Sequence, residues 1–246
     1  MINYLANPSR FLKFSKFFSP FVGWITLISL LVALYYALIK SPPAEEHGQS
    51  VRMMYTHVPA AWCALLAYTS LTVASIFSFI WRHPLADSAA KSIAKPGLAF
   101  TFLALLTGSL WGKPAWGTWW QWDGRMTSVL ILFFIYIGYL TVWSIITERK
   151  KAARLASIIA MVGFINIPII KFSVDWWNTL HQPASISSIG SPGLPFEILT
   201  PLLLMTLSYS LFFIWLVIKG IEKDITKMNI QNRKNKPLAF TEVEDT

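Results

Sequence analysis

Six separate stretches of this chain are apolar for about twenty residues each, the length that an α-helix needs to cross the hydrocarbon core of a bilayer. Every backbone N–H and C=O group in hydrocarbon needs a hydrogen-bond partner, and a helix supplies one within the segment itself. The sequence therefore predicts an all-α integral membrane protein with six transmembrane helices. The predicted spans are Phe21–Ile39, Val58–Trp81, Ile93–Trp111, Met126–Ile146, Ala152–Phe172 and Ile198–Ile218.

The low content of charged residues supports this assignment. They make up only 13% of the 246 residues, whereas a soluble domain carries about 25%. Sixteen of the 21 Lys and Arg residues fall on one side of the predicted spans, and membrane proteins retain such residues on the cytoplasmic side. Both termini are therefore predicted to be cytoplasmic. This asymmetry also accounts for the net charge of +9, so no nucleic-acid partner is expected.

The chain divides into a membrane domain at residues 1–220 and a C-terminal segment at residues 221–246. The second segment shows no apolar periodicity, and we expect it to be a mobile cytoplasmic tail. No G-x-x-x-x-G-K-[ST] motif is present in the sequence, so any coupling to ATP has to come from another subunit. Within the fifth span, Asn166 and Pro168 indicate either a kink or a tolerated helix irregularity.

A segment rich in tryptophan follows the third span, on the side predicted to be periplasmic. It runs from Trp111 to Asp123. If Pro114 begins a short helix, about 100° per residue places Trp116, Trp119, Trp120 and Asp123 on one face. Such a face either lies in the lipid headgroup layer or forms the floor of a site for a planar ligand such as a macrocycle or a quinone.

Two histidines on the same side are candidate ligands. His57 directly precedes the second predicted span. His181 follows Trp177 by four residues, a spacing that would place Trp177 and His181 on one helical face. A single interfacial histidine is usually only a wetted polar group. Two of them beside aromatic clusters favour a pair of neutral imidazoles above and below an iron macrocycle. His47 is expected to be solvated, and His83 to belong to the inner charged face.

Other polar residues on this side have secondary roles in the same hypothesis. Arg52 and Arg125 either position the membrane edge or bind the carboxylates of a haem. Asp123 is expected to orient a donor or to cap the following helix. The sequence contains no recognisable nucleophile–base set or hydrolytic metal motif, and its single cysteine, Cys63, excludes covalent C-x-x-C-H attachment of haem. We therefore expect a haem-binding component rather than an enzyme.

These residues carry a resemblance to a known family. The stretch from Trp116 to Asp123 reads W-G-T-W-W-Q-W-D and fits the W-G-x-x-W-x-W-D signature of haem-handling proteins. Together with the two histidines, the six spans and the length, the chain resembles the cytochrome c maturation protein C family, also called haem exporter protein C. The resemblance covers roughly residues 20–220.

The resemblance implies a bacterial inner-membrane protein that holds haem b as cargo at the periplasmic face. It implies His57 and His181 as axial ligands, with Trp116, Trp120, Trp122 and Asp123 at signature positions; Trp119 occupies a variable position. The implied partners are the ATPase and membrane subunits of an ABC transporter, a small single-span subunit and a periplasmic haem chaperone that passes haem to apocytochrome c.

Two alternatives from other functional classes stay open at this point. A quinol-linked b-type haem oxidoreductase would need histidine pairs within the spans, and none lies in the central part of any predicted span. A small-molecule permease would place polar residues or interrupted helices near the bilayer midplane. In this sequence the polar residues of interest concentrate outside the spans instead.

Overall fold

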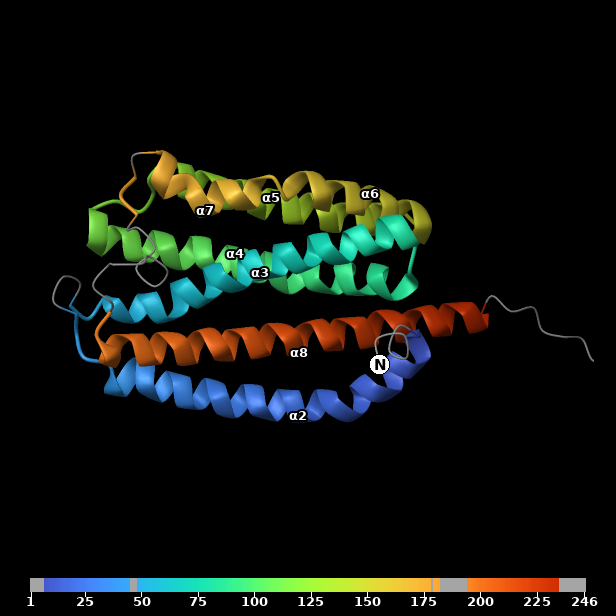
Figure 1. The fold of residues 1–246 in the computed structure, drawn as a ribbon, viewed down its shortest axis with the longest axis horizontal. Coiled ribbons are helices and arrows are strands. Elements are labelled where there is room, and N and C mark those ends of the chain that lie inside the picture. The colour runs from blue at the N-terminus through green and yellow to red at the C-terminus, as the bar shows by residue number, and fades with distance from the viewer. Residues whose placement is uncertain (1–6, 45–47, 178, 182–193, 235–246) are drawn as a thin grey trace, which may run out of the picture.

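The computed structural model shows a bundle of long helices that run nearly along one axis (Figure 1). The structure describes residues 7–44, 48–177, 179–181 and 194–234. Within these residues no β-strand is formed. The elements are α2 (Pro8–Tyr35), the π-helical extension η1 (Tyr36–Lys40), α3 (Val51–Trp81), α4 (Pro84–Trp116), α5 (Gly124–Ile145), α6 (Arg149–Gly163), α7 (Asn166–Trp176) and α8 (Phe196–Lys234).

The described residues form six helical segments that are long and apolar enough to cross a membrane. All six predicted spans are confirmed, and most helices extend beyond them. The segments are Pro8–Lys40, Val51–Trp81, Pro84–Trp116, Gly124–Ile145, Arg149–Trp176 and Phe196–Lys234. The multi-pass membrane fold expected from apolar length alone is therefore present.

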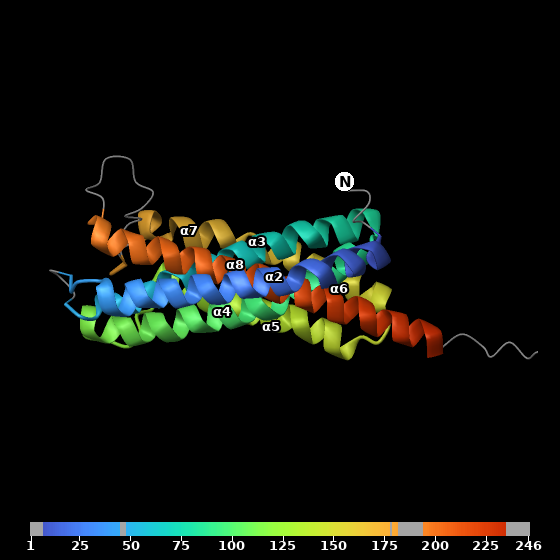
Figure 2. The ribbon, with the colours of Figure 1, turned by 90° about the horizontal axis from the view of Figure 1, so that it is seen from below.

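Helices α3 and α4 form the centre of the bundle and make the most extensive contact with each other. On one side α8 packs on this pair and α2 packs on α8, while α5, α6 and α7 cover the other side (Figure 1). The view turned by 90° shows the same elongated bundle, with α8 projecting at one end (Figure 2). The start of α2 and the end of α8 lie at the same end of the bundle, as an even number of spans requires.

Tyrosines packed against small residues hold the central helices together. Tyr68 on α3 and Tyr136 on α5 are fully buried, and their rings meet edge to face with centroids 5.1 Å apart. The hydroxyl of Tyr136 donates to the carbonyl oxygen of Ala64 at 3.2 Å. A Cβ atom at Gly97 would collide with the Tyr136 ring, so glycine at this position allows α4 and α5 to approach closely.

The fifth span is interrupted where the sequence indicated a possible irregularity. Helix α6 ends at Gly163 and α7 begins at Asn166. Pro168 lies in the first turn of α7, where its missing N–H group leaves no intrahelical hydrogen bond unmade. The side-chain amide of Asn166 donates to the carbonyl oxygen of Ser128 at 2.8 Å and joins the break to α5.

The C-terminal segment differs from the expectation of a tail that begins at residue 221. Helix α8 continues without a break to Lys234, and residues 235–246 lie outside the described residues. Ile221 and Ile225, one turn apart, are buried in the bundle. Asp224 lies beside them and accepts a hydrogen bond from Arg149 at 2.8 Å. Two isoleucines with this spacing are too short an apolar repeat to recognise among the surrounding charges.

Candidate haem-binding site

His57 lies in the second turn of α3, where its ring faces α4. Its Nδ1 atom is 3.0 Å from the carbonyl oxygen of Ala104 and 3.2 Å from the hydroxyl of Thr107. A carbonyl oxygen can only accept, so the first contact is a hydrogen bond when Nδ1 carries the proton. The Nε2 atom then keeps a free lone pair. Gly108 leaves room for the ring, because a Cβ atom there would lie 2.9 Å from Cε1 of His57.

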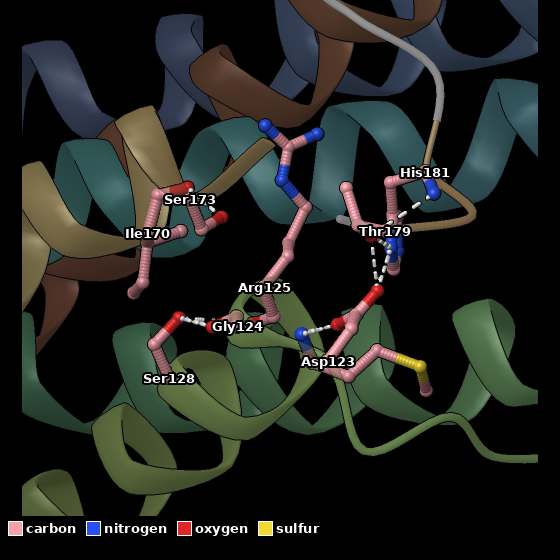
Figure 3. Close-up of polar contacts among 9 residues, drawn as sticks. Asp123, Gly124, Arg125, Ser128, Ile170, Ser173, Thr179 and His181 are labelled. Carbon is pink, nitrogen blue, oxygen red and sulfur yellow. Dashed lines mark hydrogen bonds and ion pairs between the residues drawn. The ribbon is translucent and has the colours of Figure 1, made fainter. Parts of the chain in front are cut away.

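His181 lies in the segment after α7 and is held by Asp123. Its Nδ1 atom is 2.7 Å from the carboxylate oxygen Oδ2 of Asp123, and the Thr179 hydroxyl donates to the same oxygen. Figure 3 shows the side chains of Asp123, Thr179 and His181 pointing toward one another. Because the carboxylate of Asp123 accepts this hydrogen bond, the proton of the neutral His181 ring lies on Nδ1. Imidazoles that bind metals commonly donate their second ring nitrogen to a carboxylate or a backbone carbonyl, and each of these two histidines does so.

Asp123 also begins α5. It is the N-cap residue, and its Oδ1 atom accepts from the backbone N–H of Met126 at 2.8 Å. Both roles expected for this residue, helix cap and orienting acceptor, are thus combined in one carboxylate. Burial raises the pKa of Asp123, but the hydrogen bonds from Thr179, Met126 and His181 outweigh it and hold the pKa below its ordinary value. Asp123 is therefore ionised at neutral pH.

The pKa of His181 is also lowered from its ordinary value. Burial is the larger cause, because it disfavours the imidazolium, while the hydrogen bond to Asp123 acts in the opposite direction. The imidazole is therefore neutral at pH 7. A neutral imidazole with its proton on Nδ1 offers the Nε2 lone pair that a transition metal requires.

Both histidines line one cavity of about 300 Å³. It lies between α3, α4, α5 and α7, and most of the side chains in its walls are apolar. The lining residues are His57, Val58, Ala61, Trp62, Ala64, Leu65, Ala104, Leu105, Gly108, Arg125, Met126, Val129, Leu132, Ile170, Lys171 and His181. The fold thus brings the two histidines together although 123 intervening residues separate them in the sequence.

The two predicted arginines have different positions. Arg125 lines the cavity, and Figure 3 shows its side chain extending away from the start of α5, between Ser173 and His181 in this view. Arg52 lies in the first turn of α3 and is not among the cavity-lining residues. Its Nε atom is buried without a hydrogen-bond partner among the described residues. The cavity therefore supports Arg125, but not Arg52, as a residue close to a ligand.

The tryptophan-rich segment does not form the helix that we predicted. Pro114 does not begin a helix: it lies near the end of α4, which ends at Trp116, and residues 117–123 are irregular. Gly117 ends α4 in the left-handed conformation, with φ of 78°. The segment then folds back, and the hydroxyl of Ser109 donates to the carbonyl oxygen of Trp119 at 2.6 Å. The prediction of a single aromatic face from helical periodicity is therefore wrong.

The tryptophans have separate environments instead. Trp116 packs edge-on against His181, with ring centroids 4.7 Å apart, and Trp111 packs edge-on against His57 at 5.9 Å. Trp120 and Trp122 contact each other at 5.5 Å. Trp119 and Trp122 are largely exposed. Of the signature tryptophans, only Trp116 contacts one of the two histidines in the described structure.

The helical face expected for Trp177 and His181 is also absent, because α7 ends at Trp176 and Trp177 has extended backbone dihedrals. Trp177 packs on the start of α5 instead, where a Cβ atom at Gly124 would lie 2.9 Å from its ring. His47 lies outside the described residues. His83 caps α4 by accepting from the backbone N–H of Leu85.

Two cavity residues with an aromatic or charged side chain were not predicted from the sequence. Trp62 lies on α3 five residues after His57, and Lys171 lies on α7. The sequence signal for Lys171 was available, because an ionisable residue within a span is expensive and usually functional. Trp62 gave no such signal, since one tryptophan near the end of a span is typical of an interfacial anchor.

The arrangement suits iron that already carries four ligands. Among the described residues no group of three or more His, Cys, Asp or Glu side chains is placed to hold a metal ion. Two imidazoles suffice when a planar macrocycle supplies the other four ligands, and the apolar walls suit the macrocycle itself. The residues present therefore fit a haem held by His57 and His181.

Comparison with known proteins identifies the family of the chain. A family model described as heme exporter protein C matches residues 1–236. A heme exporter protein C of Bradyrhizobium diazoefficiens is 46% identical over 228 residues, which cover 93% of this chain and 86% of that protein. A second, from Haemophilus influenzae, is 37% identical and covers 96% of each chain.

A third relative is the heme exporter protein C of Escherichia coli strain K12, which is 41% identical over 74% of each chain. The matches extend along nearly the whole sequence, and the structure brings together the two histidines that the resemblance implied. This chain belongs to the heme exporter protein C family.

Proposed function

We propose that this protein binds haem b between His57 and His181 and presents it, as cargo, for cytochrome c maturation. The observation that carries this proposal is that both histidines line one largely apolar cavity with their Nδ1 atoms already engaged by acceptors. Their Nε2 atoms are thereby left unprotonated and would be available to hold the iron of a haem. The name of the family, heme exporter protein C, agrees with a transport role rather than turnover of a substrate.

The surroundings of the two imidazoles support binding that is oriented but reversible. The Ala104 carbonyl and Asp123 fix the tautomers of the two rings, and Trp111 and Trp116 restrict the rings from the side. His57 is carried by a long helix, whereas His181 is carried by the segment after α7. His181 would then be the ligand that is exchanged on handover, because it lies outside the long helices of the bundle.

The proposed location is the bacterial inner membrane, with the haem site facing the periplasm. The excess of Lys and Arg at the end of the bundle opposite the histidines supports this orientation. The proposed partners are an ABC transporter that supplies ATP hydrolysis, a small single-span subunit, and a periplasmic haem chaperone that receives the cargo. The absence of a Walker-type motif from the sequence agrees with an external source of ATP coupling.

The test is an absorbance spectrum of the protein purified in detergent. Wild type should carry low-spin haem with two histidine ligands, and the His57→Ala/His181→Ala variant should lose those bands. His83→Ala is the matched control, since His83 only caps α4 at the opposite end of the bundle. A double variant with the wild-type spectrum would refute the assignment of the ligands.

A further inference from the structure

Thr179 contacts both of the groups that hold His181 in place. Its hydroxyl donates to Oδ2 of Asp123, the same oxygen that lies 2.7 Å from Nδ1 of His181. The hydroxyl oxygen also accepts from the backbone N–H of His181 at 3.1 Å. Thr179 is therefore joined to the carboxylate that orients the imidazole and to the main chain that carries it (Figure 3).

The hydroxyl of Thr179 and the imidazole of His181 share one acceptor atom. A carboxylate oxygen has two lone pairs, and Oδ2 of Asp123 receives both donors. The side chain of Asp123 is only 3% exposed, so water has little access to it. Each donor stabilises the same negative charge and makes the oxygen a weaker acceptor for the other. The hydrogen bond from Thr179 thus weakens the one from His181.

The strength of the hydrogen bond between His181 and Asp123 affects the other side of the imidazole ring. An acceptor that draws the Nδ1 proton more strongly leaves more negative charge on the ring and makes Nε2 a stronger metal ligand. A stronger imidazole ligand stabilises ferric iron more than ferrous iron, so it lowers the reduction potential of a haem. A second donor to the carboxylate has the opposite effect.

We propose that Thr179 is a positioning residue that limits the pull of Asp123 on His181 and thereby keeps His181 an exchangeable iron ligand of intermediate strength. This inference rests on the proposed haem function and deepens it. A carboxylate that received only the imidazole on Oδ2 would strengthen the ligand and favour retention of haem. The neutral hydroxyl reduces this effect without removing the acceptor, which suits a protein that passes its haem on.

The test removes the hydroxyl and nearly preserves the shape of the side chain. In Thr179→Val the potential of bound haem should fall, with the ratio of the ferrous to the ferric dissociation constant raised about three- to tenfold. In the apo protein with isotope-labelled histidine, the Nδ1 proton resonance of His181 should move downfield. Thr179→Ala should give the same two shifts if the valine variant does not fold. Thr179→Ser retains the hydroxyl and should resemble wild type in both measurements.

Thr206→Val is the matched control, because the hydroxyl of Thr206 donates to the Leu202 carbonyl one turn earlier in its own helix. It should change neither the potential nor the resonance. A purely structural role for Thr179 would weaken ferric and ferrous binding equally, and an unchanged ratio of the two constants would overturn the proposal. Failure of wild type to bind haem in low-spin form would instead overturn the proposed haem function, while the apo resonance would still report the competition for Asp123.

Discussion

The Nδ1 atom of His181 lies 2.7 Å from Oδ2 of Asp123, across a separation of 58 positions in the sequence. The same carboxylate caps α5 through its other oxygen. The position of one candidate iron ligand is therefore coupled to the start of a membrane-spanning helix. In the signature sequence the aspartate has a positional role, and it does not need to touch the ligand itself.

Asp123→Asn separates these two roles. Asparagine is as good a helix cap as aspartate, but its amide does not hold the proton on Nδ1 of His181 as a carboxylate does. The imidazole is then free to adopt the other tautomer, with the proton on Nε2. We expect haem affinity to fall about 10- to 100-fold, measured by titration of the apo protein.

The thermal unfolding midpoint of apo Asp123→Asn should stay close to that of wild type, because the cap is preserved. Asp123→Ala should lower both the affinity and the midpoint, since it removes the cap as well. A wild-type haem affinity in Asp123→Asn would show that the carboxylate does not orient His181.

Haem coordination should resist mild acid. Since burial lowers the pKa of His181 below its ordinary value near 6.5, the imidazole stays neutral at pH values where an exposed histidine is already protonated. We expect the low-spin spectrum to be unchanged from pH 8 to 6.5. On further acidification it should be lost with a midpoint below 6.5. Asp123, with its lowered pKa, stays ionised across this window.

The lowered pKa of His181 also determines the direction in which the stability of the apo protein changes with pH. The unfolded state takes up a proton on His181 near pH 6.5, while the folded state resists protonation until the pH is lower, so the contribution of this group to stability falls as the pH drops below 6.5. Denaturant titrations at pH 7.5 and 6 measure it, with His181→Gln as the control that lacks the group. If the low-spin spectrum were lost with a midpoint at or above pH 6.5, the burial assigned to His181 would be contradicted.

Gly108→Ala should disturb His57 without changing any polar group. The added methyl group would lie 2.9 Å from the imidazole ring, and the ring cannot retreat without losing its hydrogen bond to Ala104. We expect at least a tenfold loss of haem affinity or a conversion to high-spin iron, detected by absorbance.

Gly138→Ala is the matched control, because its added methyl group would meet no atom from another part of the described structure within 4 Å. It should bind haem like wild type, with stability unchanged or raised by up to about 1 kcal/mol through helix propensity. Equal behaviour of the two variants would remove the steric role assigned to Gly108.

Asp224→Ala should destabilise the end of the bundle opposite the histidines. Its carboxylate accepts from Arg149 at 2.8 Å and from Ser88 at 2.8 Å, and it lies 3.3 Å from Nζ of Lys91. Removing it leaves two partly buried cations without their anion, at a cost of about 1–3 kcal/mol. The measurement is the thermal unfolding midpoint in detergent.

Glu148→Ala serves as the control for this prediction, since its ion pair with Lys151 is largely exposed and should contribute little to stability. Equal midpoints for the two variants would show that α8 beyond residue 220 does not help to hold the bundle. Haem affinity should stay at the wild-type value in both variants, because the network lies far from the cavity.

Apolar length and charge asymmetry predicted the number of spans, their approximate positions and the common end of the two termini. These properties are local, because each helix satisfies its own backbone hydrogen bonds in hydrocarbon. Histidines beside tryptophans also pointed to one end of the bundle, where both His57 and His181 line one cavity. Helical periodicity failed for residues 117–123, where Gly117 ends α4, and for the pair Trp177 and His181, because α7 ends at Trp176.

The sequence by itself thus determined that the chain crosses a membrane six times and carries two candidate imidazole ligands at one end. Only the tertiary structure decided that His57 faces the carbonyl oxygen of Ala104, that His181 faces Asp123, and that Lys171 shares the cavity with Arg125 while Arg52 does not. The reason is physical. A helix fixes the direction of its side chains relative to its own axis, but which helix they meet depends on how the small residues and tyrosines of α3, α4 and α5 pack.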